Sequence, residues 1–483
     1  MKKNLLYSFL YEVIIALYPL LLIPYLSATI GKSGIGIYSY TYSIVGFFLL
    51  VCQLGVNTCG TRAIAKTRNN KKEMTRTFKC IFLIQVSASA ISILAFLIYV
   101  FLFAQKYQFY FVLLLPFLIG QGIRISWFFL GLENIATILL RNVMIRLVSA
   151  VLIVLFVKTE ASLPLYFLIM SLSYLLGDIS VWPKALKMLD IAKIDKATVY
   201  KYIKPMMVMF LPILALRGAY YTDEIMLGFL KDTDSVAIYE NVYKVVNMPL
   251  QLYTVLANVF TAQASHLVAT KQNNKNVGYV MNSIDMSSAI MFPIIFGMIA
   301  IAKEFVPWYM GETFLECIGV MHVLPIVLIF SGITSILRTQ YFIPLEQDRK
   351  YVTTIAMGVL MNIILNCILI PEFSYIGVAI ATVISEMMIT FLSVNIIQRK
   401  DRIVRAFRYF PLYLSDAVLM LVVIRVIGNK LGVGIGTNIL QIICGGAVYL
   451  IILFGFQRLF AGRDKLSLYH VMINMFQSMM QKK

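Results

Sequence analysis

The chain has 483 residues, of which 60% are hydrophobic and only 13% are charged, and its mean hydropathy is +0.83. This apolar share exceeds that of soluble domains, so the composition predicts a polytopic membrane protein without a separate soluble domain. The formal net charge of +19 does not indicate nucleic-acid binding. The basic residues gather in loops between apolar segments, where they orient a membrane protein.

Apolar windows of about 20 residues recur along the whole chain, and each is long enough to cross a bilayer as a helix. We therefore predict an all-α polytopic fold with about fourteen transmembrane helices. The first window is interpreted as a retained span, because Glu12 interrupts it and its apolar character continues past Leu26. The predicted spans are 8–30, 36–58, 79–103, 109–130, 138–157, 163–182, 205–229, 237–262, 282–302, 318–337, 352–370, 374–396, 410–427 and 435–457.

Basic loops alternate with loops that hold one lysine or none. The segments 62–79 and 184–204 carry seven and six basic residues, whereas the short loops around Lys32 and Lys231 hold one lysine each. Because cytoplasmic loops are enriched in lysine and arginine, this alternation predicts that both termini are cytoplasmic. Arg141 is counted with the cytoplasmic segment between the fourth and fifth spans.

An internal repeat organises the chain. The segment Val236–Val246 aligns without a gap on Ile35–Val45, and this alignment pairs Tyr239 with Tyr38. It predicts two six-helix lobes related by a pseudo-two-fold axis along the membrane normal, with the substrate between them. The predicted domains are an N-lobe at 1–183, a basic cytoplasmic linker at 184–204, a C-lobe at 205–398, and two appended helices with a cytoplasmic tail at 399–483.

Five basic side chains fall inside predicted spans, where each costs about 2.5 to 3.5 kcal/mol to insert. They are Arg124, Arg146, Arg217, Lys244 and Arg425. We expect Arg124, Arg146 and Arg217 to face a cavity and bind substrate, because no acidic residue lies one turn away on the same helix. Lys244 is either a further cavity residue or the partner of Glu240 one turn before it. Arg425 is expected to reach the membrane interface.

Polar residues repeat at helical spacing on several spans. On the fifth span Asn142, Arg146 and Ser149 share one face. Further substrate-binding candidates are Glu12, Tyr221, Asn247 and Gln251, and the ion-coupling candidates are Asp178, Glu224 and Glu240. The sequence has no phosphate-binding glycine loop, nucleophile elbow or metal-ligand spacing. We therefore predict a protein that is not an enzyme and uses no cofactor or metal.

Several short segments appear in an order that we associate with one family. They are Leu22–Leu26 (LIPYL), Gly36–Tyr40 (GIYSY), Trp127–Glu133 (WFFLGLE), Asp223–Gly228 (DEIMLG) and Ile376–Glu386 (IGVAIATVISE). With them, the chain resembles Wzx-type O-antigen and polysaccharide flippases over its first twelve spans. These flippases belong to the multidrug/oligosaccharidyl-lipid/polysaccharide (MOP) exporter superfamily. Arg124 departs from the pattern of many members, in which an acidic or amide residue precedes the tryptophan.

The resemblance implies alternating-access translocation of an undecaprenyl-diphosphate-linked oligosaccharide, an O-antigen or capsule repeat unit, across a bacterial inner membrane. It also implies contact with membrane lipids, H+ or Na+ as a candidate coupling ion, and polysaccharide polymerase machinery as a candidate partner. Two alternatives stay open. A drug or cation antiporter of the same fold would use Glu12, Asp178 and Glu224. A membrane polysaccharide polymerase or ligase normally needs a large external loop, and the sequence contains none.

Overall fold

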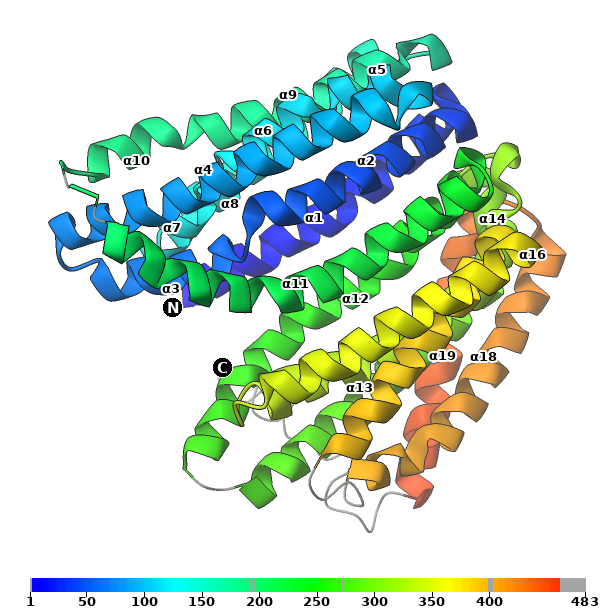
Figure 1. Ribbon diagram of the computed structural model, residues 1–483. Helices are drawn as coiled ribbons and strands as arrows, with labels where there is room; N and C mark the ends of the chain where they lie inside the picture. The colour runs from blue at the N-terminus through cyan, green and yellow to red at the C-terminus, as the bar shows by residue number, and fades with distance from the viewer. Residues whose placement is uncertain (1, 192, 195, 271–272, 398–402, 461–483) are drawn as a thin grey trace. The chain divides into compact units, whose positions relative to one another are not determined.

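The protein is helical throughout the part that its computed structural model describes, which is the whole chain except residues 1, 192, 195, 271–272, 398–402 and 461–483 (Figure 1). Within that part there is no strand, and 9 helical segments are long and apolar enough to cross a membrane, or 10 with one bent pair. The predicted all-α polytopic fold is confirmed. The count of fourteen spans and the two symmetric lobes stay predictions.

Contacts divide the chain into two units, residues 1–240 and 241–483. The division falls within one helix, α12 (Thr233–Ala269). The linker 184–204 and the helix that follows it therefore belong to the first unit by their contacts. The predicted domain ranges follow the sequence repeat rather than contacts, and they stay a prediction.

The first unit contains eleven α-helices and the start of α12. Its elements are α1 (Lys2–Thr29), α2 (Gly31–Gln53), α3 (Val56–Thr67), α4 (Lys71–Leu102), η1 (Gln105–Tyr107), α5 (Gln108–Leu113), α6 (Leu115–Gly122), α7 (Ser126–Gly131), α8 (Ile135–Phe156), η2 (Glu160–Ser162), α9 (Leu163–Ser180), α10 (Trp182–Met188) and α11 (Lys196–Leu230). In Figure 1 α4 and α6 run alongside α2, in agreement with their contacts, and α9 packs on α6.

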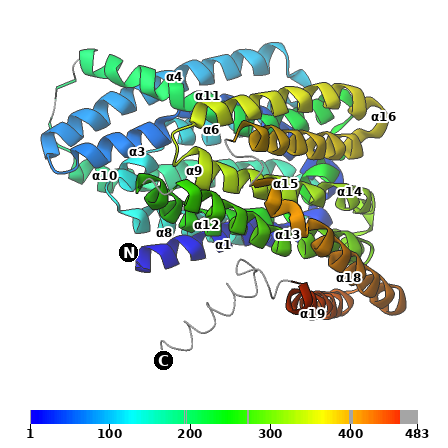
Figure 2. The same ribbon diagram turned by 90° about the horizontal axis from the view of Figure 1, so that it is seen from below.

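The second unit contains the rest of α12 and the helices that follow. They are α13 (Asn273–Tyr309), η3 (Glu312–Phe314), α14 (Cys317–Val323), η4 (Leu324–Ile326), α15 (Val327–Ile336), η5 (Leu337–Phe342), α16 (Asp348–Ile396), η6 (Arg405–Tyr409), α18 (Phe410–Leu431) and α19 (Ile435–Phe460). The appended helices α18 and α19 lie side by side in both views, and each packs on α13 (Figure 2).

The outer surface of α4 shows why these helices need a membrane. Ile91, Leu94, Ile98 and Phe101 recur at helical spacing and are each at least half exposed. The opposite face of the same helix buries polar residues, including Gln85. Water would penalise an apolar stripe of this kind, whereas the hydrocarbon of a bilayer accommodates it.

Small residues allow α2 and α11 to approach closely. A Cβ atom at Gly46 of α2 would lie 2.5 Å from the ring of Tyr221 on α11. Gly228 of α11 gives the same room to the ring of Tyr40. Glycine at helix contacts is typical of membrane helices, since close packing is a main source of their association.

Two predicted spans are broken, and two others join into one kinked element. The span 36–58 ends as a helix at Leu54, which is left-handed, and Gly55 (φ 70°) leads into α3. The span 109–130 forms α5, α6 and α7. The bend between α5 and α6 is 50°, and a second break separates α6 from α7. The predicted spans 352–370 and 374–396 form one kinked element, α16, whose break is at Ser374 (φ 50°). The break before α7 shapes the candidate site.

Candidate functional site

A polar cavity with a volume of about 80 Å³ lies inside the first unit. Its lining comes from α1, α6, α8, α9 and the turn after α6. The lining residues are Tyr18, Gln121, Arg124, Arg141, Asn142, Ile145, Arg146, Ser149, Met170, Ser173, Tyr174 and Asp178. Such a volume holds several water molecules. It is smaller than the roughly 300–1,000 Å³ of a site for a drug-sized ligand.

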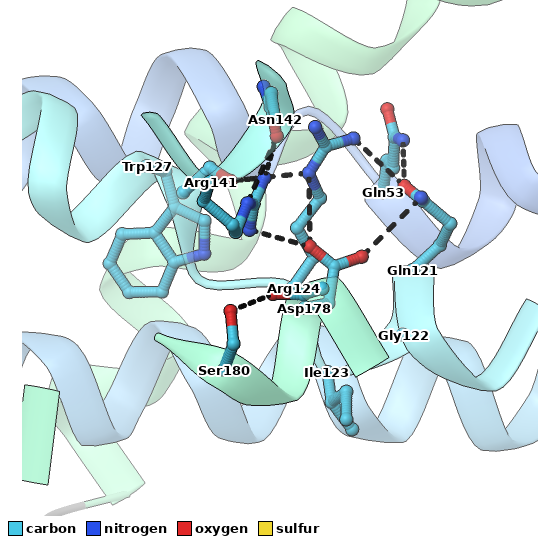
Figure 3. A network of polar contacts seen from close by, with 12 residues as sticks. Gln53, Gln121, Gly122, Ile123, Arg124, Trp127, Arg141, Asn142, Asp178 and Ser180 are labelled. Carbon is cyan, nitrogen blue, oxygen red and sulfur yellow. Dashed lines mark hydrogen bonds and ion pairs between the residues drawn. The ribbon is translucent and has the colours of Figure 1, made fainter. Parts of the chain in front are cut away.

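Asp178 is the acidic residue of this lining, and two arginines converge on it (Figure 3). Its side chain is 4% exposed, and its Oδ1 lies 2.8 Å from Nη1 of Arg141 and 3.7 Å from Nε of Arg124. Arg146 adds a third guanidinium group to the wall. The wall thus carries three guanidinium groups and one carboxylate, and the cavity keeps an excess of positive charge that can attract an anion.

The broken helix holds Arg124 at the cavity wall. Between α6 and α7 the backbone leaves the helical path, which frees carbonyl groups that need partners inside a membrane. Gln85 of α4 supplies them, because its Nε2 donates to the carbonyl oxygens of Gly122 and Arg124 at 2.9 Å each. Its Oε1 accepts a hydrogen bond of 3.0 Å from the indole of Trp127, which is fully buried. Gln85 therefore fixes the turn that carries Arg124.

Arg146 lies against α1 on the other side of the cavity. Its guanidinium carbon is 4.9 Å from the centre of the Tyr18 ring, within the range of a cation–π interaction. The Tyr18 hydroxyl forms a hydrogen bond of 2.9 Å with the Ser149 hydroxyl. Asn142, Arg146 and Ser149, which the sequence places on one helical face, all line the cavity.

The other predicted binding residues do not line this cavity. Arg217 lies on α11 with an exposed side chain, and Tyr221 is buried one turn later. Tyr42 of α2 lies close enough to be influenced by the charges of both Arg217 and Arg146. Lys244, Asn247 and Gln251 lie on α12 beyond residue 240 and are half-buried in the second unit. The side chain of Glu12 falls outside the described part of the chain.

The structure separates the ion-coupling candidates into two groups. Asp178 is the counter-ion of the arginine cavity. Glu224 and Glu240 form a second cluster, in which the charge of Glu240 is close enough to influence Glu224. Ser43 donates to Glu224, and the Tyr220 hydroxyl donates to Glu240 at 2.8 Å. Both glutamates are buried, at 1% and 6% exposure.

Sequence reasoning missed several residues of the cavity region, among them Arg141, Tyr18 and Gln85. Arg141 was assigned to a loop, but it lies in α8 with only 6% of its side chain exposed. Tyr18 and Gln85 carry no charge, so the pattern of charged residues within spans does not indicate them. Arg141 lies four residues before Ile145, so helical spacing places it on the same face of α8 as a lining residue, and this spacing could have indicated it. Arg425 pairs with Glu304 at 3.9 Å, and its extension to the membrane interface stays a prediction.

Solved structures define the class of fold. The structure titled "Lipid II flippase MurJ, inward closed conformation" matches with a TM-score of 0.71 at 16% identity, covering 94% of this chain and 98% of that chain. An inward-facing multidrug resistance MATE family transporter of the MOP superfamily matches with a TM-score of 0.57 at 12% identity, covering 86% and 95%. The chain therefore has the helical membrane fold of MOP transporters.

The sequence comparisons are more specific. The family model described as "Polysaccharide biosynthesis protein" matches residues 1–261, more than half of the chain, and the protein belongs to this family. The "Putative O-antigen transporter" of Escherichia coli (strain K12) is 22% identical over 412 residues, covering 84% of this chain and 98% of the relative. The "Probable low-salt glycan biosynthesis flippase Agl15" of Haloferax volcanii is 24% identical over 182 residues, covering 37% and 38%. The resemblance to Wzx-type members of the MOP superfamily is confirmed.

Proposed function

We propose that the protein is a flippase that moves a lipid-linked oligosaccharide from the cytoplasmic to the outer face of a bacterial inner membrane. The substrate is an undecaprenyl-diphosphate-linked O-antigen or capsule repeat unit, and the protein is a transporter rather than an enzyme. Family membership and the names of the relatives support the substrate class. Both termini lie in the cytoplasm, in keeping with the basic loops.

The cavity in the first unit is the observation that supports this function best. Arg124, Arg141 and Arg146 contribute three positive charges, and Asp178 offsets one of them. A diphosphate carries the opposite charge and offers oxygen acceptors that suit guanidinium groups. Tyr18 and Tyr174 add aromatic surface to the same wall, which suits the apolar faces of sugar rings.

The small cavity also requires a conformational change. A volume of about 80 Å³ holds no oligosaccharide. Transport therefore includes a state in which the helices around the cavity separate, as alternating access demands. Arg217, Lys244, Asn247, Tyr221, Gln251 and Glu12 remain candidates for contacts with the sugar or the diphosphate in that state. Glu224 and Glu240 remain candidates for binding the coupling ion, H+ or Na+, and a polysaccharide polymerase is a candidate partner.

The test replaces the cavity charges one at a time. We expect Arg146→Glu and Arg124→Glu to lower surface polysaccharide roughly tenfold or more, because each loses a charge-assisted hydrogen bond to the substrate. The variants are expressed in a strain that lacks its own flippase. Surface polysaccharide and the lipid-linked oligosaccharide held on the cytoplasmic face are both quantified.

Arg68→Glu is the matched control, since Arg68 is a half-exposed arginine that pairs with Glu133 at the surface of the same unit. It should export normally. Normal export by both cavity variants at wild-type abundance would remove the cavity from the mechanism. Efflux of cationic dyes, with no effect on polysaccharide in a deletion strain, would instead support the antiporter alternative.

A further inference from the structure

The second unit contains a buried carboxyl group without a partner in the described part of the chain. Asp416 of α18 is 0% exposed. Neither of its carboxyl oxygens has a hydrogen-bond partner among the described residues. Buried polar atoms almost always have partners, so a carboxyl group with none calls for an explanation.

Asp416 lies in a polar cluster made by three helices. Asp285 of α13 is 8% exposed, and its Oδ1 accepts a hydrogen bond of 2.7 Å from the Tyr413 hydroxyl. Tyr413 precedes Asp416 by one turn on α18. Tyr449 of α19 lies within electrostatic reach of both carboxyl groups, and its hydroxyl donates to the carbonyl oxygen of Ala289 at 2.9 Å. The hydroxyl groups of Tyr413 and Tyr449 thus donate to other acceptors, and neither donates a hydrogen bond to Asp416.

No basic side chain of the described part pairs with Asp416. The elements packed on α18 are α13, α19 and η6. On α18 itself, Arg425 lies more than two turns away and pairs with Glu304 of α13. Arg405 and Arg408 of η6 are exposed, and Arg408 lies over the Tyr409 ring at 4.9 Å. Among its described side chains, α19 brings Tyr449 and no charge.

An ionised carboxylate in such a place is strongly disfavoured, because it has lost its hydration and gained neither a cation nor a donor. The neutral acid avoids that cost. A metal cation would need several oxygen ligands arranged around the carboxylate, and no group of three or more acidic, histidine or cysteine side chains that could hold a metal occurs in the described residues. The chemistry of the cluster therefore suits a proton.

We propose that Asp416 is a proton-binding site of the second unit. Asp416 holds its proton while α13, α18 and α19 are packed as they are here. It releases the proton to water in a conformation that opens this packing. Since a proton that favours one conformation shifts the population toward it, protonation of Asp416 biases the movement of these helices. The role in coupling rests on the proposed flippase function, whereas proton binding does not.

Carbodiimide labelling tests the proton directly, because dicyclohexylcarbodiimide modifies protonated carboxyl groups in apolar surroundings. The full chain is purified in lipid nanodiscs, treated across about pH 5 to 9, and analysed by mass spectrometry of its peptides. We expect Asp416 to take up about tenfold more label than the exposed Glu312, with labelling that falls as the pH rises. Asp416→Asn should remove the label from that peptide.

Two controls keep the result decisive. Glu312→Gln lacks an exposed carboxyl group of the same unit and should leave the labelling of Asp416 unchanged. If Asp416→Asn folds poorly, Asp416→Glu keeps a carboxyl group at this position and should still be labelled. Monodisperse elution shows whether each of the two variants is folded. The proposal would be overturned if Asp416 were labelled no more than Glu312 at every pH. It would also be overturned if Na+ at constant pH protected Asp416 from labelling, because that result would indicate a cation site. Labelling is measured without transport, so a failure of the flippase function would appear separately, as normal surface polysaccharide in a deletion strain.

Discussion

Removal of the Asp178 carboxylate tests whether the cavity is built on a buried ion pair. In Asp178→Asn, Arg141 keeps its place in α8 but loses the counter-ion that lies 2.8 Å away. The Coulomb energy of a pair at that distance is about 6 kcal/mol at an effective dielectric constant of about 20. Part of this energy offsets the desolvation of both ions, and removal of one partner from a buried pair typically costs about 3 to 5 kcal/mol.

The exposed pair of Glu133 with Arg68 is the matched comparison. Its atoms are 2.6 Å apart, but its side chains are 72% and 39% exposed. Solvent screens such a pair, so Glu133→Gln should cost less than about 1 kcal/mol. Distance alone would predict the opposite ranking. Burial is therefore the variable that the two substitutions separate.

The free energy of unfolding is measured in mixed micelles for both single variants and for Asp178→Asn combined with Arg141→Gln. We expect the Asn variant to lose about 3 kcal/mol. The double variant should lose at least about 0.5 kcal/mol less than the sum of its two single changes, because the arginine no longer needs a partner. Equal stability of Asp178→Asn and Glu133→Gln would refute the reasoning and remove the ion pair from the architecture of the cavity.

Two further predictions follow from the packing and the charges. Gly46→Ala should destabilise the first unit by about 1–3 kcal/mol in the same unfolding assay, because its Cβ would meet the Tyr221 ring. The control Gly278→Ala on α13 should be neutral or stabilising, because a Cβ atom there has nothing within 4 Å. Equal effects of the two substitutions would argue against the tight α2–α11 contact. In a cysteine-free background, an impermeant thiol reagent added to spheroplasts should label Ser33→Cys but not Asn70→Cys, because the basic segment 62–79 is cytoplasmic. Labelling of Asn70→Cys but not of Ser33→Cys would contradict the predicted topology.

The sequence by itself determined the features that depend on local spacing. Apolar windows gave the membrane class, since the length of a spanning helix is set by the bilayer. Helical periodicity placed Asn142, Arg146 and Ser149 on one face, and all three line the cavity. These inferences need only the geometry of one helix.

Tertiary structure decided which charges meet. The partner of Arg141 is Asp178, on the next helix but far along the chain, and no helical spacing connects them. The break that presents Arg124 depends on Gln85 from α4. Asp416 is an ordinary residue of an appended span until α13 and α19 bury it without a partner. Long-range packing sets the desolvation and the partners of a charged group, and those two quantities decide whether it stabilises the fold, binds an anion or holds a proton.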